Sequence, residues 1–218
     1  MHIEPGFVSA AKVMGANVAA IGILGFYLKR LVANPMDLIK GVLAAVFFSV
    51  FMQSFHLSVG PSELHFIGAM SIYLTLGFVP TIFGFALGLL LQGLVFDPID
   101  LPHLAVNSLS LIAPLIAVHY ATGKKLFDKG LKQRVSWRAI LKLDAIYYAG
   151  VTSMVGFWLT IGEVATPFSA WLSFAGSYLA VFALEPFITL LTVKMLKRYE
   201  NAPAVKRLFV VERLSLKA

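Results

Sequence analysis

The first two residues of the chain, Met1 and His2, together offer three nitrogen atoms that could bind a transition metal. These atoms are the terminal amine, the backbone amide nitrogen of His2 and a ring nitrogen of His2. They lie within one short segment and can share a plane, which is the arrangement that Ni(II) and Cu(II) prefer. Because three nitrogens leave one corner of a square plane open, another part of the chain must supply the fourth ligand.

His65 is our candidate for that fourth ligand. It follows Gly60 and Pro61, which favour a loop that could dip into a helix bundle, and it begins a short apolar segment. A single histidine in such a place is more often a residue at a helix end or a membrane interface. Combined with the Met1–His2 pair, the interpretation as a metal ligand becomes the stronger one.

Three polar residues are candidates for hydrogen bonds that orient the ligating imidazoles, namely Ser62, Asn107 and Ser110. A histidine bound to a metal usually donates its second ring nitrogen to a neighbour. For Asn107, a hydrogen bond between helices that only packs the bundle explains the residue equally well.

Composition indicates that these residues are positioned inside a membrane. The chain has 218 residues, a mean hydropathy of +0.83, 59% hydrophobic residues and only 13% charged residues. A soluble domain carries about 25% charged residues, so this chain has too little polar surface for one. It has no cysteine, which excludes thiolate ligands and disulfides and leaves nitrogen or oxygen to bind any metal.

The hydropathy pattern predicts an all-α polytopic membrane protein with seven transmembrane helices. The apolar segments run at about 8–28, 41–56, 65–79, 80–96, 103–122, 141–161 and 168–193. The third and fourth are short, so we expect that at least one does not cross the full bilayer, with a tight turn marked by Gly77, Pro80 and Gly84.

Charge predicts the orientation of these helices. With the N-terminus outside and the C-terminus in the cytoplasm, the cytoplasmic regions hold 17 of the 18 Lys and Arg residues. The net charge of +7 is explained by this bias, so nucleic acid is not an expected partner. We expect one transmembrane domain over residues 1–199 and a cytoplasmic tail over 200–218, in a bacterial inner membrane. The tail would be solvated or lie at lipid headgroups, or else dock a partner.

At this point the chain resembles the CbiM/NikM family, the substrate-binding (S) components of energy-coupling-factor importers for nickel and cobalt. The resemblance rests on Met1-His2-Ile3, on Ser62-x-x-His65-x-x-Gly68 and on Asn107-x-x-Ser110, and it covers about residues 1–120. It implies an N-terminus that enters the bundle from outside and a metal held by Met1, His2 and His65. It also implies a transmembrane coupling (T) component and a pair of cytoplasmic ATPases as partners.

The expected function is therefore capture of Ni(II) or Co(II) as the transported substrate of an ATP-driven importer of the ABC type. No catalytic constellation, organic cofactor or nucleotide-binding motif is recognisable, so the chain is not expected to be an enzyme and energy must come from another chain. One alternative is a membrane cytochrome that binds haem through His103 and His119, each with a partner on another helix. Another alternative is a membrane scaffold without cargo.

A few further polar residues have no assigned role at this stage. His56 and His103 are reserve ligands that also suit an interface position. Lys12 is the one basic residue away from the predicted cytoplasmic regions, and it could reach outward or pair with Glu4 or Glu63. Glu185 is an intramembrane carboxyl group that could contact a coupling partner or pair with a lysine such as Lys194.

Ligation by the terminal amine predicts that metal affinity falls toward acid pH. Methionine is retained before a residue as large as histidine, so the Met1 amine should be free, with an ordinary pKa of about 7.7–8.0. Metal binding must expel the proton of that amine and, if the His2 amide ligates, a second proton. Nickel titrations at several pH values measure this, and a flat affinity between mildly acidic and neutral pH would contradict amine ligation.

Overall fold

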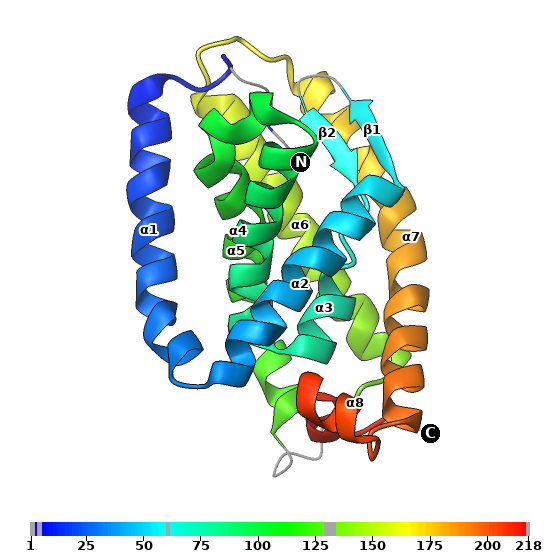
Figure 1. Cartoon of the computed structure of the whole chain (residues 1–218). Helices are drawn as coiled ribbons and strands as arrows, with labels where there is room; N and C mark the ends of the chain where they lie inside the picture. Colours follow the sequence, from blue (N-terminus) through cyan, green and yellow to red (C-terminus); the bar gives the residue numbers. More distant parts are fainter. Residues whose placement is uncertain (1–2, 4–5, 60–61, 129–133, 217–218) are drawn as a thin grey trace.

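The chain forms a bundle of long helices in the computed structural model, which describes residues 3, 6–59, 62–128 and 134–216 (Figure 1). The helices are α1 (Ala10–Val32), α2 (Pro35–Ser54), α3 (Ala69–Leu76), α4 (Phe78–Val95), α5 (Leu104–Ala121), α6 (Trp137–Ile161), α7 (Phe168–Arg198) and α8 (Pro203–Leu208). The 3₁₀ turns η1 (Pro98–His103) and η2 (Gly123–Phe127) lie between helices, and a third, η3 (Val211–Arg213), follows α8. The chain runs up and down between two ends of the bundle, one of them covered by α8.

Five helices in the described part of the chain are long and apolar enough to cross a membrane: α1, α2, α4, α5 together with η1, and α7. The prediction of an all-α polytopic membrane protein agrees with this finding. The eight residues of α3 extend for only about 12 Å at 1.5 Å per residue. Because a bilayer core is about 30 Å thick, α3 alone does not cross one, as the short segment at 65–79 indicated.

A two-stranded antiparallel hairpin departs from the all-helical prediction. Strands β1 (His56–Val59) and β2 (Ser62–His65) pair with His56 opposite His65. Each arm beside Gly60-Pro61 is too short for a helix of its own, so inter-strand pairing satisfies its backbone groups instead. The hairpin lies at the end of the bundle where α1 begins, opposite to α8 (Figure 1).

The predicted turn between the third and fourth segments is confined to Gly77. This residue ends α3 with a φ of +95°, a conformation that favours glycine. Pro80 lies instead in the first turn of α4, where its missing N–H breaks no helical hydrogen bond. Gly84 lies inside α4 and packs against α2, so the prediction was wrong for these two residues.

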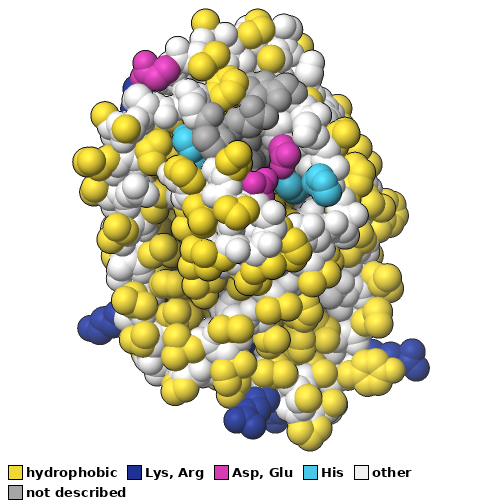
Figure 2. Space-filling model, turned by 45° about the horizontal axis from the view of Figure 1, so that its top comes forward, with side chains coloured by type: hydrophobic (Ala, Val, Ile, Leu, Met, Phe, Trp, Pro, Cys, Tyr) yellow, Lys and Arg dark blue, Asp and Glu magenta, His cyan; other side chains and the backbone are white. Residues whose placement is uncertain are grey.

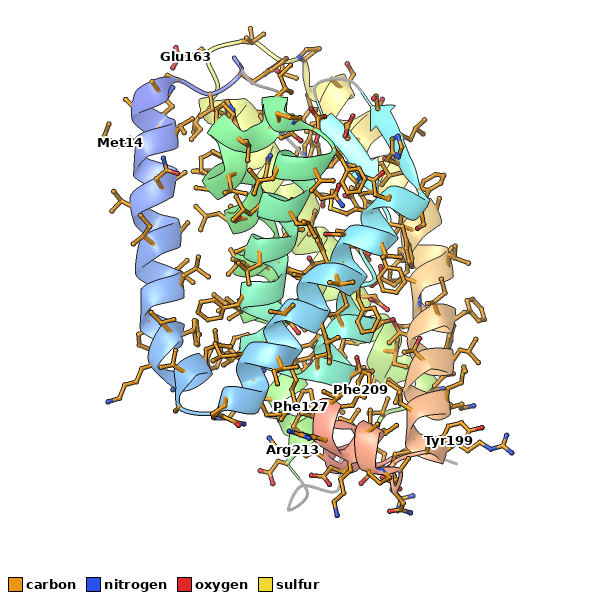
Figure 3. All side chains as sticks on the ribbon, viewed as in Figure 1. Met14, Phe127, Glu163, Tyr199, Phe209 and Arg213 are labelled. Atoms are coloured by element: carbon orange, nitrogen blue, oxygen red, sulfur yellow. The ribbon has the colours of Figure 1, made fainter. Side chains whose placement is uncertain are left out.

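The end of the chain folds back beneath the bundle. The backbone N–H of Val210 donates to the carbonyl of Thr75 at 2.8 Å, and that of Val135 donates to Ser215 at 2.7 Å. Val211 and Leu214 are buried, whereas Arg213 lies at the surface of this end (Figure 3). The apolar residues of the tail are therefore packed in protein, and the expectation of a solvated tail fits only its charged side chains.

Because α4 packs closely on α2, we expect alanine to destabilise the fold at Gly84 but not at Gly22. A Cβ at Gly84 would lie 2.3 Å from the Cβ of Ala44, whereas a Cβ at Gly22 of α1 meets nothing within 4 Å. We expect Gly84→Ala to destabilise the fold by about 1–3 kcal/mol because the helices must separate. Gly22→Ala, the matched control, should be neutral or stabilising. Thermal unfolding of both variants in detergent compares them, and equal melting temperatures would contradict this packing.

Candidate metal site

The N-terminal segment is fixed inside the bundle at Ile3. The backbone N–H of Ile3 donates to Oδ1 of Asn107 at 3.0 Å. Ile3 also forms an isolated antiparallel bridge to Ser62, the first residue of β2. The side chain of Ile3 is fully buried. The segment is therefore held between α5 and the hairpin, whereas Met1 and His2 themselves lie outside the described residues.

Helix α5 presents Asn107 and Ser110 on one face, one turn apart. Asn107 uses its side-chain oxygen for the Ile3 amide, so its role includes holding the N-terminal segment and goes beyond packing two helices. The hydroxyl of Ser110 donates to the carbonyl of Val106 at 2.9 Å and accepts the indole N–H of Trp158 at 3.0 Å. Ser110 thus joins α5 to α6, and its contribution to a metal site stays a prediction.

His65 is almost buried, with 5% of its surface exposed, and its ring has a defined orientation. The Nε2 atom of His65 lies 3.0 Å from Oε2 of Glu63. An ionised carboxylate only accepts hydrogen bonds, so beside an ionised Glu63 the Nε2 atom donates, and a neutral His65 ring would then hold its lone pair on Nδ1. The partner Glu63 stands two residues before His65, on the same face of a strand, a relation that a helical interpretation of this segment could not reveal.

His56 lies beside His65 as its partner across the hairpin. The two rings are stacked, with centroids 6.1 Å apart and planes inclined by 28°. His56 is exposed whereas His65 is almost buried, so the two imidazoles occupy different environments on one hairpin. Acidic and histidine side chains gather near the hairpin in Figure 2, whereas Lys and Arg side chains mark the opposite end.

A clamp of polar contacts holds the chain between Ile3 and α1. The ammonium group of Lys12 lies 2.6 Å from the carboxylate of Glu163 and donates to the carbonyl of Ile161 at 2.6 Å. The backbone N–H of Glu163 donates to the carbonyl of Phe7 at 2.8 Å. The hydrogen bond from Lys12 holds the pKa of Glu163 below its usual range.

Lys12 pairs with Glu163 and not with Glu63, as one of the two expected pairings had it, whereas Glu4, the other expected partner, lies outside the described residues. The correct partner, Glu163, follows α6, 151 residues further along the chain, and Figure 3 shows Glu163 beside the start of α1. Nothing local in the sequence reveals this proximity, because it depends on how α1 packs against the loop between α6 and α7.

The remaining two histidines lie at opposite ends of α5. His103 is buried against the backbone of Val8. His119 bonds the hydroxyl of Tyr73 through Nδ1 at 2.8 Å and stacks on Phe78 at 3.7 Å. These contacts give His119 a packing role, and no group of three or more His, Cys, Asp or Glu residues in the described ranges could hold a metal. The haem alternative gains no support from this arrangement.

Removal of the Asn107 acceptor tests the anchor at Ile3. Asn107→Leu leaves the buried Ile3 N–H without its acceptor, at a cost of about 1–3 kcal/mol. We expect faster hydrogen exchange of the Ile3 amide, measured by NMR. Asn17→Leu, at an exposed position on α1, is the control and should leave that amide unchanged. Unaltered Ile3 exchange in Asn107→Leu would contradict the anchor.

Comparison with known proteins places the chain among metal-transport components. Two crystal structures share its fold, each at 21% sequence identity. The first is of a transition metal transporter (TM-score 0.74, covering 94% of this chain and 96% of that one), and the second is of a truncated transition metal transporter (TM-score 0.72, 91% and 99%). Curated proteins gave no significant match. At this identity the structures show the fold alone.

A family model described as the cobalt uptake substrate-specific transmembrane region, CbiM, matches residues 2–203. Members of this family are membrane-embedded components of cobalt or nickel transport and are not enzymes. The match includes the start of the chain, the hairpin, α5 and the remaining helices down to the beginning of α8. This multi-pass membrane protein therefore belongs to the CbiM family.

Proposed function

We propose that the chain is the substrate-specific subunit of an ATP-driven importer of the energy-coupling-factor type, which captures Ni(II) or Co(II) at its outer face. The metal is held by the Met1 amine, the His2 amide and ring nitrogens, and the His65 ring. The observation that carries this proposal is the position of Ile3, the residue covalently bonded to His2. Ile3 is buried and attached to β2, the strand that carries His65.

The direction of the Ile3 bridge supports convergence of the ligands. In an antiparallel bridge, the residues before Ile3 run alongside the residues after Ser62. Continued in this direction, the register carries the chain from Ile3 back toward His65. Consecutive Cα atoms are 3.8 Å apart and strand residues rise about 3.3 Å, so two residues suffice to reach from Ile3 to the His65 end of β2.

The chemistry of β2 also suits a divalent ion. The bond between Nε2 and Glu63 leaves the lone pair of His65 on Nδ1, and a carboxylate that accepts the other ring hydrogen is the usual partner of a ligating histidine. A deprotonated His2 amide and the Glu63 carboxylate supply two negative charges against the two positive charges of the metal. This balance lowers the cost of burying the ion. Planar ligation by four nitrogens favours Ni(II) over Co(II).

Charge and family membership support the rest of the proposal. Lys and Arg gather at the end that carries α8, so this end faces the cytoplasm of a bacterial inner membrane and the hairpin faces outward (Figure 2). The seven membrane segments then comprise α1 to α7, with α3 and the hairpin together replacing one full helix. A coupling (T) component and cytoplasmic ATPases supply the energy, because the sequence contains no nucleotide-binding motif.

A blocked N-terminus provides the sharpest test of this site. One extra residue ahead of Met1 converts its amine into an amide, which removes one ligand and leaves every side chain in place. We expect native, untagged protein to bind nickel at about one ion per chain and the extended protein to lose it, as measured by metal analysis. The same residue added after Ala218 is the control and should not alter binding.

The two stacked histidines of the hairpin offer a matched pair of variants within the same test. His65→Gln removes a ligand and should reduce nickel affinity by at least about 100-fold, or 2.7 kcal/mol. His56→Gln changes its exposed neighbour and should leave affinity within a few fold. Nickel binding that persists in the extended protein and in His65→Gln would refute the site. Native protein that binds neither metal would favour a scaffold without cargo.

A further inference from the structure

Two carboxyl groups are buried in the middle of the bundle, far along the chain from the candidate metal site. Asp144 on α6 and Glu185 on α7 each have 0% of their surface exposed. None of the ion pairs between described residues includes either one. The expected pairing of Glu185 with Lys194 is therefore not what the structure shows. Two unpaired negative charges in so apolar a place would cost several kcal/mol each.

The surroundings of Glu185 suit an ionised carboxylate. Its Oε1 accepts the backbone N–H of Met70 at 3.2 Å, and its Oε2 accepts a hydrogen bond from the hydroxyl of Tyr148. The backbone N–H groups of Gly68 and Ala69 point to the same carboxylate. These donors belong largely to the first turn of α3, so Glu185 caps the helix that directly follows the hairpin.

The surroundings of Asp144 are different. Neither of its carboxyl oxygens has a hydrogen-bond partner, although both are fully enclosed. The hydroxyl of Tyr147, on the next turn of α6, is also enclosed and without a partner. Asp144 and Tyr147 both interact electrostatically with Glu185. A carboxyl group without donors around it is the one that an added proton would neutralise.

We propose that Asp144 and Glu185 form a proton-binding site inside the membrane, in which Asp144 carries the bound proton and Glu185 stays ionised. The titratable groups that face the pair are the phenols of Tyr147 and Tyr148 on α6 and of Tyr178 on α7. On the α3 side the pair meets backbone N–H groups. A proton on Asp144 removes the repulsion between the two carboxyl groups, while Glu185 keeps the hydrogen bonds that stabilise its charge.

The position of the site connects it to the hairpin. Three residues, 66–68, separate His65 from the first turn of α3 that Glu185 caps. Gly68 has a φ of +64°, and a Cβ there would lie 2.2 Å from the ring of Phe51, so this connection has little freedom. Tyr178 lies against the backbone of His65, and its ring centroid is 5.2 Å from that of Tyr148, with the planes inclined by 35°. Loss of the proton would act on α3, α6 and α7 together.

Infrared spectroscopy of the full-length, metal-free protein tests the proposal independently of the proposed function. The C=O stretch of a protonated carboxylic acid is distinct from carboxylate bands and shifts in deuterated water. At neutral pH we expect this band in the natural protein and in Glu185→Gln, and its complete loss in Asp144→Asn. Asp37→Asn is the control, because Asp37 pairs with Lys40 at the start of α2, away from the two buried carboxyl groups. This variant should keep the band.

Several outcomes would overturn the proposal. The first is that the natural protein lacks the band. The second is that Glu185→Gln loses the band while Asp144→Asn keeps it. The third is that the band of the natural protein disappears when sodium chloride replaces choline chloride. The last result would indicate a sodium ion in place of the proton. If Asp144→Asn does not fold, an alkaline titration of the natural protein replaces it. Reversible loss of the band at high pH supports a proton site, and a band that never titrates refutes it.

Discussion

The hydrogen bond from the Ile3 amide to Asn107 is the contact on which the geometry of the hairpin end of the bundle depends. Inside a bilayer no water satisfies a free N–H, so a chain terminus that enters the bundle needs acceptors from the protein. Asn107 provides one, and the bridge to Ser62 pairs the backbone of the same residue. Because Ile3, Asn107 and Ser62 are all buried, Ile3 has few alternative positions.

The irregular segment between α2 and α4 follows the same constraint. The hairpin and the short helix α3 take the place of one continuous helix, and their backbone groups are satisfied by protein. Strand pairing satisfies β1 and β2, and the carboxylate of Glu185 receives the N–H groups at the start of α3. Broken membrane segments of this kind occur where they are buried in protein or line a binding cavity. This break requires a buried carboxylate, Glu185, and the protonation of Asp144 that we propose removes a second negative charge beside it.

The bundle is also polarised from end to end. The clamp between Lys12 and Glu163 holds Phe7 and the start of α1 at the same end as the hairpin and its histidines. The other end carries the folded tail, in which Val210 bonds to α3 at Thr75. Helix α3 contacts the tail at one end and follows the hairpin at the other, and α7 also contacts both the hairpin and the tail.

The sequence by itself determined the class of protein, because its hydropathy and scarcity of charge permit only a membrane bundle. It also singled out two of the residues that lie together at the hairpin end of the bundle. Ser62 and Asn107 follow from short motifs and lie together around Ile3, while ligation by Met1, His2 and His65 stays a prediction. Motif spacing carries such information because each motif falls on one short element with a fixed side-chain direction.

Only the tertiary structure decided which distant groups become partners. Lys12 pairs with Glu163, and Glu185 accepts hydrogen bonds from Met70 and Tyr148. His65 contacts Glu63 because both lie on a strand that the hydropathy pattern does not predict. Hydropathy predicts whether a segment is apolar. It does not predict which helices are neighbours or where a membrane segment is interrupted by a hairpin. These choices depend on close packing of whole helices, such as Gly84 against Ala44, and on the need to satisfy every buried polar group at once.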